Sequence, residues 1–311
     1  MTSSSLLPIR HRLAQLVSHL VVALVALVVI GGATRVMEAG LACPDWPLCY
    51  GTVLPGRQMN GQVFLEWFHR LDAFVIGVAL LVQLGASWWW RHQLPRWLLP
   101  SSAVLVLLVM LQGALGALTV LQLLPTGVVT AHLAVGLTLV VMVSGLSQLL
   151  RVDDSSPPVS SPWWWRLFGS LTLLAVVSQC LLGGRMATSW AAKRCLDVGQ
   201  ACQWLHWHRS AAMPVAITVL SFVVLALLVG GWTRRQWPFL LPTAALVMVQ
   251  IGLGVFSLRL GLAQPVVTVA HQLVACLLVA LLAALTCRRP RLADTSDAAD
   301  VESSSLEPCH G

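Results

Sequence analysis

The hydrophobic residues of this chain form long continuous runs that short polar segments separate. Each run has about the 20 apolar residues that are needed to cross a hydrocarbon core of about 30 Å. The runs lack a period of two, so they predict helices rather than the strands of a barrel. We expect eight membrane-spanning helices near residues 13–33, 66–87, 98–122, 126–149, 166–187, 206–231, 239–260 and 264–287. The predicted fold class is an all-α integral membrane protein.

Composition and charge strengthen this prediction. Of the 311 residues, 57% are hydrophobic and only 10% are charged, and the mean hydropathy is +0.80. A soluble domain carries about 25% charged residues, so a soluble globular protein is excluded. The formal net charge of +7 is first a topology signal, and nothing in it calls for a nucleic-acid partner.

Arginine positions indicate the orientation in the membrane. If the N-terminus is cytoplasmic, Arg10 and Arg12 precede the first run, and every inner connection carries at least two Arg. Because cytoplasmic loops are enriched in Lys and Arg, both termini are predicted to be cytoplasmic. The first run has no small-residue cleavage site before Arg35, so we expect a retained helix rather than a signal peptide.

The two halves of the chain resemble each other. The segment LQGALGALTVLQLLPTGVVTAHL in the first half matches VQIGLGVFSLRLGLAQPVVTVAHQL in the second. His69 and His208 are 139 residues apart, and so are His132 and His271. Because each half holds four helices, both halves enter the membrane in the same sense. We therefore expect two parallel-repeat four-helix bundles, related by a pseudo-twofold axis along the membrane normal.

A weaker similarity relates Gly31-Gly32 to Gly183-Gly184, each of which precedes a pair of cysteines. The predicted organisation comprises a cytoplasmic N-terminus (1–12), an N-terminal four-helix bundle (13–150), a cytoplasmic linker (151–165), a C-terminal four-helix bundle (166–287) and a disordered cytoplasmic tail (288–311).

The four repeated histidines are candidates for metal binding. His69, His132, His208 and His271 fall near the outer ends of the second, fourth, sixth and eighth predicted helices. Ligating groups are costly in a membrane core and usually functional. Two imidazoles facing each other across an apolar bundle suit haem iron, whose axial ligands are opposed. The alternatives are zinc, which needs three or four ligands, and hydrogen-bonded helix packing.

Three charged residues lie beside these histidines. Arg70 and Arg209 each follow a repeat histidine, where a guanidinium can bind haem propionates or extend to lipid headgroups. Glu66 lies three residues before His69, on the same helical face. It can act as a base or charge stabiliser, or simply favour the helix N-terminus. Its counterpart is Leu205, so we expect only the first pocket to carry chemistry.

Two pairs of the eight cysteines lie in the long outer loops. Cys43 and Cys49 form one pair, and Cys195 and Cys202 form the other. Because outer loops are oxidising, two disulfides within the loops are predicted. They can be structural, or the first can exchange with a redox partner.

Several segments together resemble the heme A synthase family, and the resemblance covers about residues 13–287. These are GGATRVMEAGLACPDWPLCYG at 31–51, EWFHR at 66–70, TAHL at 130–133, HR at 208–209 and VAHQ at 269–272. The resemblance implies an eight-helix membrane oxidoreductase of haem A biosynthesis. Such an enzyme oxidises the C8 methyl group of haem O to a formyl group, through successive hydroxylations and loss of water, and supplies haem A for cytochrome c oxidase.

The resemblance also implies roles for individual residues. His69 and His132, with Arg70 beside them, would line the pocket of the substrate haem, with Glu66 as the catalytic acidic residue. His208 and His271 would be the axial ligands of a resident haem b iron, with Arg209 as a propionate candidate. Cys43 and Cys49 would match the family's first-loop disulfide; some members lack the pair formed here by Cys195 and Cys202.

The implied partners are haem O as substrate, a haem O synthase as its donor, an electron acceptor of unknown identity, membrane lipid and, downstream, cytochrome c oxidase assembly. A homo-oligomer is left open. With no transit peptide at its start, the chain is expected in a bacterial inner membrane. The alternative functions are a quinone-linked b-type electron-transfer cytochrome, without haem modification, and a thiol oxidoreductase that works through the outer cysteines.

Overall fold

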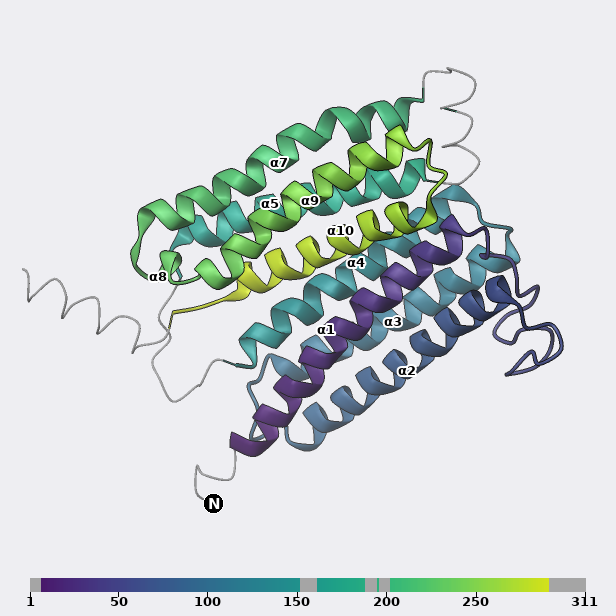
Figure 1. Ribbon diagram of the computed structural model, residues 1–311. Helices are drawn as coiled ribbons and strands as arrows, with labels where there is room; N and C mark the ends of the chain where they lie inside the picture. Colours follow the sequence, from purple (N-terminus) through teal and green to yellow (C-terminus); the bar gives the residue numbers. More distant parts are fainter. Residues whose placement is uncertain (1–6, 152–160, 188–194, 196–201, 291–311) are drawn as a thin grey trace, which may run out of the picture.

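The computed structural model (Figure 1) describes residues 7–151, 161–187, 195 and 202–290. Over these residues the structure is helical, and eight of its helices are long and apolar enough to cross a membrane. The all-α multi-pass prediction is thereby confirmed. The spanning helices are α1 (Leu7–Val36), α2 (Gly61–Trp89), α3 (Leu98–Leu121), α4 (Thr126–Leu149), α5 (Trp163–Met186), α7 (Gln203–Val229), α9 (Trp237–Arg259) and α10 (Pro265–Cys287), and a short helix α8 (Gly231–Arg234) follows α7.

Local sequence explains where the helices differ from the predicted runs. Helix α2 begins several residues before the predicted 66 because Asn60 caps it. Its Oδ1 accepts hydrogen bonds from the backbone N–H groups of Gln62 and Val63, both at 3.0 Å. Helix α7 ends at Val229 because Gly230 takes a φ of 80°, a conformation that glycine adopts without strain.

The spanning helices pack as two groups of four. Helices α1 to α4 contact one another in a ring, and α5, α7, α9 and α10 form a second ring. Helices α4 and α10 lie between the two groups, in contact with each other and with α1 and α5 (Figure 1). The side chain of the fully buried Trp165 donates a hydrogen bond to the Leu285 carbonyl at 2.9 Å, which fixes α5 against α10. These contacts leave the pseudo-twofold axis as a prediction.

Polar contacts close the end of the bundle that holds the start of α1. Arg10 donates to the Leu150 carbonyl at 3.0 Å, where α4 ends. Arg288 donates to the side-chain oxygens of Gln236 and Gln148 at 2.5 and 3.1 Å. Cations beside helix C-termini are favoured by the helix dipole. The predicted linker residues 152–160 and the tail from 291 to 311 lie outside the described residues.

Candidate functional site

The four repeated histidines lie at one end of the bundle. His69, His132, His208 and His271 each fall within the first nine residues of α2, α4, α7 and α10. These four helices begin at the bundle end opposite Leu7 (Figure 1). The sequence prediction placed the histidines at one shared depth, and their positions in these helices agree with it.

Each histidine packs against a glycine of the preceding spanning helix. A methyl group built at Gly31 on α1 would lie 2.8 Å from the His69 ring, and one at Gly183 on α5 would lie 2.9 Å from the His208 ring. The corresponding distances are 3.4 Å from Gly116 to His132 and 3.2 Å from Gly254 to His271. Contacts shorter than about 3.0 Å leave no room for a side chain, so glycine is required at the first two positions.

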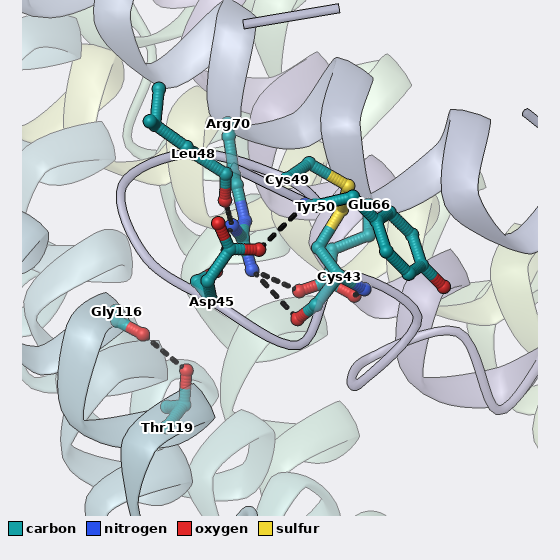
Figure 2. Close-up of polar contacts among 9 residues, drawn as sticks. All are labelled: Cys43, Asp45, Leu48, Cys49, Tyr50, Glu66, Arg70, Gly116 and Thr119. Atoms are coloured by element: carbon teal, nitrogen blue, oxygen red, sulfur yellow. Dashed lines mark hydrogen bonds and ion pairs between the residues drawn. A yellow bond between two sulfur atoms is a disulfide. The ribbon is translucent and has the colours of Figure 1, made fainter. Parts of the chain in front are cut away.

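Two threonines act on the glycines of the first half. The hydroxyl of Thr34 donates to the Gly31 carbonyl at 2.7 Å, and that of Thr119 donates to the Gly116 carbonyl at 2.6 Å (Figure 2). Such hydroxyl bonds within one turn satisfy a polar group inside the membrane and bend the helix slightly. The carbonyl of each of these two glycines therefore accepts a hydrogen bond from a threonine of its own helix.

In the second half of the chain the two imidazole rings lie close together, with one edge directed at the other ring. The ring centroids of His208 and His271 lie 6.4 Å apart, and the ring planes are at 82° to each other. The Nδ1 of His208 lies 3.2 Å from the Gln179 carbonyl, which leaves Nε2 as the nitrogen available to a ligand. Gln179 also donates from its amide to the His208 carbonyl at 2.7 Å. These bonds fix the orientation of the His208 ring.

This separation fits one metal ion between the two rings. A ligating imidazole nitrogen lies about 2 Å from a transition metal, so rings on opposite sides of one iron have centroids roughly 6 Å apart. The buried Nδ1 of His271 has no hydrogen-bond partner, and the amide of Gln250 lies 3.2 Å from its Nε2. Binding of iron through Nε2 therefore requires that amide to turn away. With two ligands in a pair, the residues suit haem better than zinc.

The first pair, His69 and His132, also consists of imidazoles that pack against glycines between spanning helices. The Nδ1 atoms of His69 and His132 are buried, next to the backbone of Leu27 and Gln112 respectively. Below His132, the Gln112 amide of α3 and Val28 of α1 both approach Gly136 of α4. Nε2 is therefore the nitrogen that remains for a ligand in this pair, as it is in His208.

Glu66 lies beside this pair but is bonded to the outer loop. Its side chain is buried, with 4% of its surface exposed. Oε2 accepts a hydrogen bond from the Cys43 backbone N–H at 2.9 Å, and Oε1 is paired with Arg70 at 2.5 Å (Figure 2). These two contacts hold the carboxylate between the loop and Arg70.

Arg70 is bonded to the loop as well. Nη1 donates to the carbonyls of Asp45 and Leu48, and Nη2 donates to Glu66 and to the Cys43 carbonyl at 3.4 Å. All four of its terminal N–H groups therefore have acceptors. The predicted binding of a propionate by Arg70 would have to use Nε or displace these carbonyls. Arg209 is exposed.

The loop that Arg70 holds is closed by a disulfide. Cys43 and Cys49 are bonded and almost fully buried, with their Cα atoms 4.8 Å apart. Asp45 accepts hydrogen bonds from the backbone N–H groups of Tyr50 and Gly51 at 2.7 and 2.8 Å. These bonds, that from Gly51 above all, hold the pKa of the Asp45 carboxyl below its ordinary value.

Cys195 and Cys202 are bonded too, with Cα atoms 5.6 Å apart. Both disulfides predicted from the sequence are therefore present. Among the other cysteines in the described part of the chain, Cys180, Cys276 and Cys287 are free.

Sequence reasoning missed several residues of this site. It noted Gly31 and Gly183 as part of a repeat but did not place them against the histidine rings, and it did not single out Gly116 and Gly254, which stand at matching places in the repeated segments. It also overlooked Gln250, which opens one of these segments. Pairing each repeated histidine with the nearest repeated glycine would have found these positions.

A known protein family matches almost the whole membrane-spanning part of the chain. The sequence model of the family described as cytochrome oxidase assembly protein (COX15-CtaA) matches residues 14–283. The chain belongs to this family. The matched region includes residues of all eight spanning helices and both histidine pairs.

Several similar proteins bear the name Heme A synthase. That of Shewanella oneidensis is 29% identical over 189 residues, which is 54% of this chain and 54% of the relative's own length. That of Rhodospirillum centenum is 28% identical and covers 79% of this chain and 80% of the relative. That of Erythrobacter litoralis is 28% identical and covers 82% and 90%. Family membership implies that haem takes part in the function.

Proposed function

We propose that this chain is a heme A synthase, which oxidises the C8 methyl group of haem O to a formyl group and so produces haem A for cytochrome c oxidase. The observation that carries the proposal is the pair of His208 and His271, whose rings lie 6.4 Å apart, beside a second histidine pair that alone has an acidic neighbour. The names of its relatives and the family assignment support it.

We assign the second pair to a resident cofactor. His208 and His271 would hold the iron of haem b, and Gly183 and Gly254 lie against their rings. Haem b, when bound, supplies one-electron transfer. The chain's contribution is to fix the two imidazoles, through Gln179 and the helix contacts, and to surround the group with apolar residues that exclude water.

We assign the first pair to the substrate haem. His69 and His132 would line that pocket, with Arg70 at its outer end. Haem O is largely apolar, so a pocket between spanning helices lets it enter from the membrane. Helices that hold the histidines rigidly would place the methyl group in one orientation, which lowers the entropic barrier to reaction.

Glu66 is the proposed catalytic residue. Oxidation of a methyl group on a porphyrin develops positive charge at that carbon, which a nearby carboxylate stabilises. Arg70 and the Cys43 N–H fix the Glu66 carboxylate at the outer end of the pocket. Leu205 occupies the matching position in the second half, and so we place the chemistry in the first half only.

The remaining predictions of location and partners belong to this proposal. We place the chain in a bacterial inner membrane with both termini in the cytoplasm, as the arginine distribution favours. A haem O synthase would be the donor of the substrate. The division into two bundles, a linker and a tail, and a homo-oligomeric state, also stay predictions.

The test is chromatography of haems extracted from cells that make haem O and express this chain. We expect haem A to accumulate. Glu66→Ala and Glu66→Gln should retain the protohaem absorption spectrum and lose the conversion. If the folded wild-type chain yields only protohaem despite a supply of haem O, the enzyme proposal is wrong and the result favours the b-type electron-transfer alternative.

A further inference from the structure

Arg35 lies where the two groups of helices meet. It belongs to the last turn of α1, and its Nη2 donates a hydrogen bond at 2.8 Å to the carbonyl of Gly184 on α5. The side chain is half-buried. An arginine that crosses from one half to the other at this depth is costly to bury, so a role for its charge is expected.

Both proposed haem pockets are next to this residue. Gly31, one turn before Arg35, lies against the His69 ring, and Gly183, directly before Gly184, lies against the His208 ring. Arg35 therefore lies one helical turn from the glycine that contacts His69, and it is bonded to the residue that follows the glycine in contact with His208. It is at the polar end of the bundle, as the carboxylate edge of a bound haem would be.

Most of the hydrogen-bonding capacity of Arg35 is unused among the described residues. A guanidinium has five N–H groups, and among the described residues its one acceptor is the Gly184 carbonyl. Arg70, by contrast, uses all four terminal N–H groups on Glu66 and the loop. Arg209 is exposed and does not reach the junction through any described contact. Of these three arginines, Arg35 alone combines N–H groups without a described acceptor and a position next to both proposed pockets.

We propose that Arg35 binds a haem carboxylate at the junction of the two pockets. This inference rests on the proposed haem-binding function. The planar guanidinium fork matches a carboxylate in two parallel hydrogen bonds, whereas a lysine ammonium cannot make both. The competing explanation is that Arg35 only caps the C-terminus of α5, where the Gly184 carbonyl belongs to the last turn.

The two explanations separate when the carboxylates of the ligand are blocked. The probes are iron protoporphyrin IX and its dimethyl ester, titrated into the haem-depleted full chain in detergent and followed by the Soret band. The variants are Arg35→Gln, Arg35→Lys and, as a matched control, Arg259→Gln. Arg259 is also an arginine in the last turn of its helix, and it is exposed.

We expect Arg35→Gln to weaken binding of the diacid roughly tenfold, the worth of one charge-assisted hydrogen bond, and to leave ester binding unchanged. Arg259→Gln should change neither. Equal losses for diacid and ester, or no loss, would overturn the proposal in favour of capping. If Arg35→Gln does not accumulate as a folded protein, Arg35→Lys takes its place in the experiment. Its preference for the diacid over the ester should then be lower than that of the wild type, and an unchanged preference rejects the proposal.

Two further backgrounds identify the haem concerned. With His132→Ala only the second pocket should bind tightly, and with His271→Ala only the first. Arg35→Gln should lower the preference for the diacid over the ester in one of these two backgrounds, and the pocket that is intact in that background is the one whose haem Arg35 binds. If the preference falls in neither background, the proposal is rejected. Failure of the proposed function is distinct from this, because a wild-type chain that binds neither probe removes the haem assignment itself.

Discussion

The backbone N–H of Cys43 donates a hydrogen bond to Oε2 of Glu66 at 2.9 Å. The acidic residue of the first pocket is therefore bonded directly to the disulfide loop outside the membrane. The other oxygen of Glu66 pairs with Arg70, which in turn binds three carbonyls of the same loop (Figure 2). The geometry of the loop thus determines where the carboxylate lies.

Replacement of Arg70 tests this arrangement. Arg70→Gln leaves the buried Glu66 carboxylate without its cation and three loop carbonyls without a donor. Removal of one partner of a buried pair costs about 3 kcal/mol, so thermal unfolding in detergent should shift to lower temperature. Conversion of haem O should fall with it.

Arg209→Gln is the control for Arg70→Gln. It is the repeat counterpart of Arg70, but it is exposed and should leave the unfolding temperature unchanged. Equal thermal shifts in the two variants would contradict the proposed role of Arg70 in the loop.

Removal of the first disulfide should affect the first pocket selectively. The double variant Cys43→Ser, Cys49→Ser opens a loop of six-residue separation, which costs about 2 kcal/mol by loop-closure entropy. Because the Cys43 N–H holds Glu66, haem A formation should decrease while the protohaem spectrum of the second pocket stays unchanged. Haem extraction and absorption spectra measure the two effects.

The corresponding variant of Cys195 and Cys202 is the comparison. These cysteines have no described contact with Glu66, so haem A formation should be less affected. A loss of the protohaem spectrum in the Cys43/Cys49 variant would show that the loop supports both pockets, contrary to the contacts described here.

The glycines beneath the histidines offer a test of each pocket in turn. In Gly183→Ala the new methyl group would lie 2.9 Å from the His208 ring, so the ring must move. We expect weaker haem b binding and a shifted absorption spectrum, with a loss of about 1–3 kcal/mol from overpacking. Gly31→Ala should leave that spectrum intact and lower conversion, because its methyl group meets His69 instead.

Gly252→Ala provides the matched control for these variants. Gly252 lies on α9 in the second half, and a methyl group there would meet nothing within 4 Å. Both its spectrum and its conversion should equal those of the wild type. If Gly183→Ala behaves in the same way, His208 does not depend on the close contact with α5.

Much of this architecture could be predicted because membrane spans are long and uniform. The eight runs identified the eight helices, and the offset of 139 between histidine pairs selected the four histidines of the proposed pockets. A polar residue inside an apolar run stands out, so His69 and His271 were visible without any structure.

The contacts between residues could not be predicted in the same way. Arg70 was expected to bind a propionate because it follows His69, yet its side chain extends to carbonyls of a loop more than 20 residues earlier in the chain. Nothing in local sequence encodes which way a long side chain turns. The role of Gly183 was equally hidden, because a glycine in a helix shows its purpose only when the neighbouring helix is in place.

Asp45 makes the outer loop sensitive to acid. Its pKa is lowered in the folded protein, mainly by the hydrogen bond from the Gly51 N–H. A carboxyl with a lowered pKa stabilises the fold at pH values above its unfolded pKa of about 3.9, and this stabilisation is lost as the pH falls through the folded value. Hydrogen exchange of the Tyr50 and Gly51 amides, corrected for intrinsic rates, should therefore stay slow down to about pH 4 and accelerate below it. Asp45→Asn should exchange faster at neutral pH and lose most of the acid dependence, whereas retention of the wild-type profile would show that other groups control the loop.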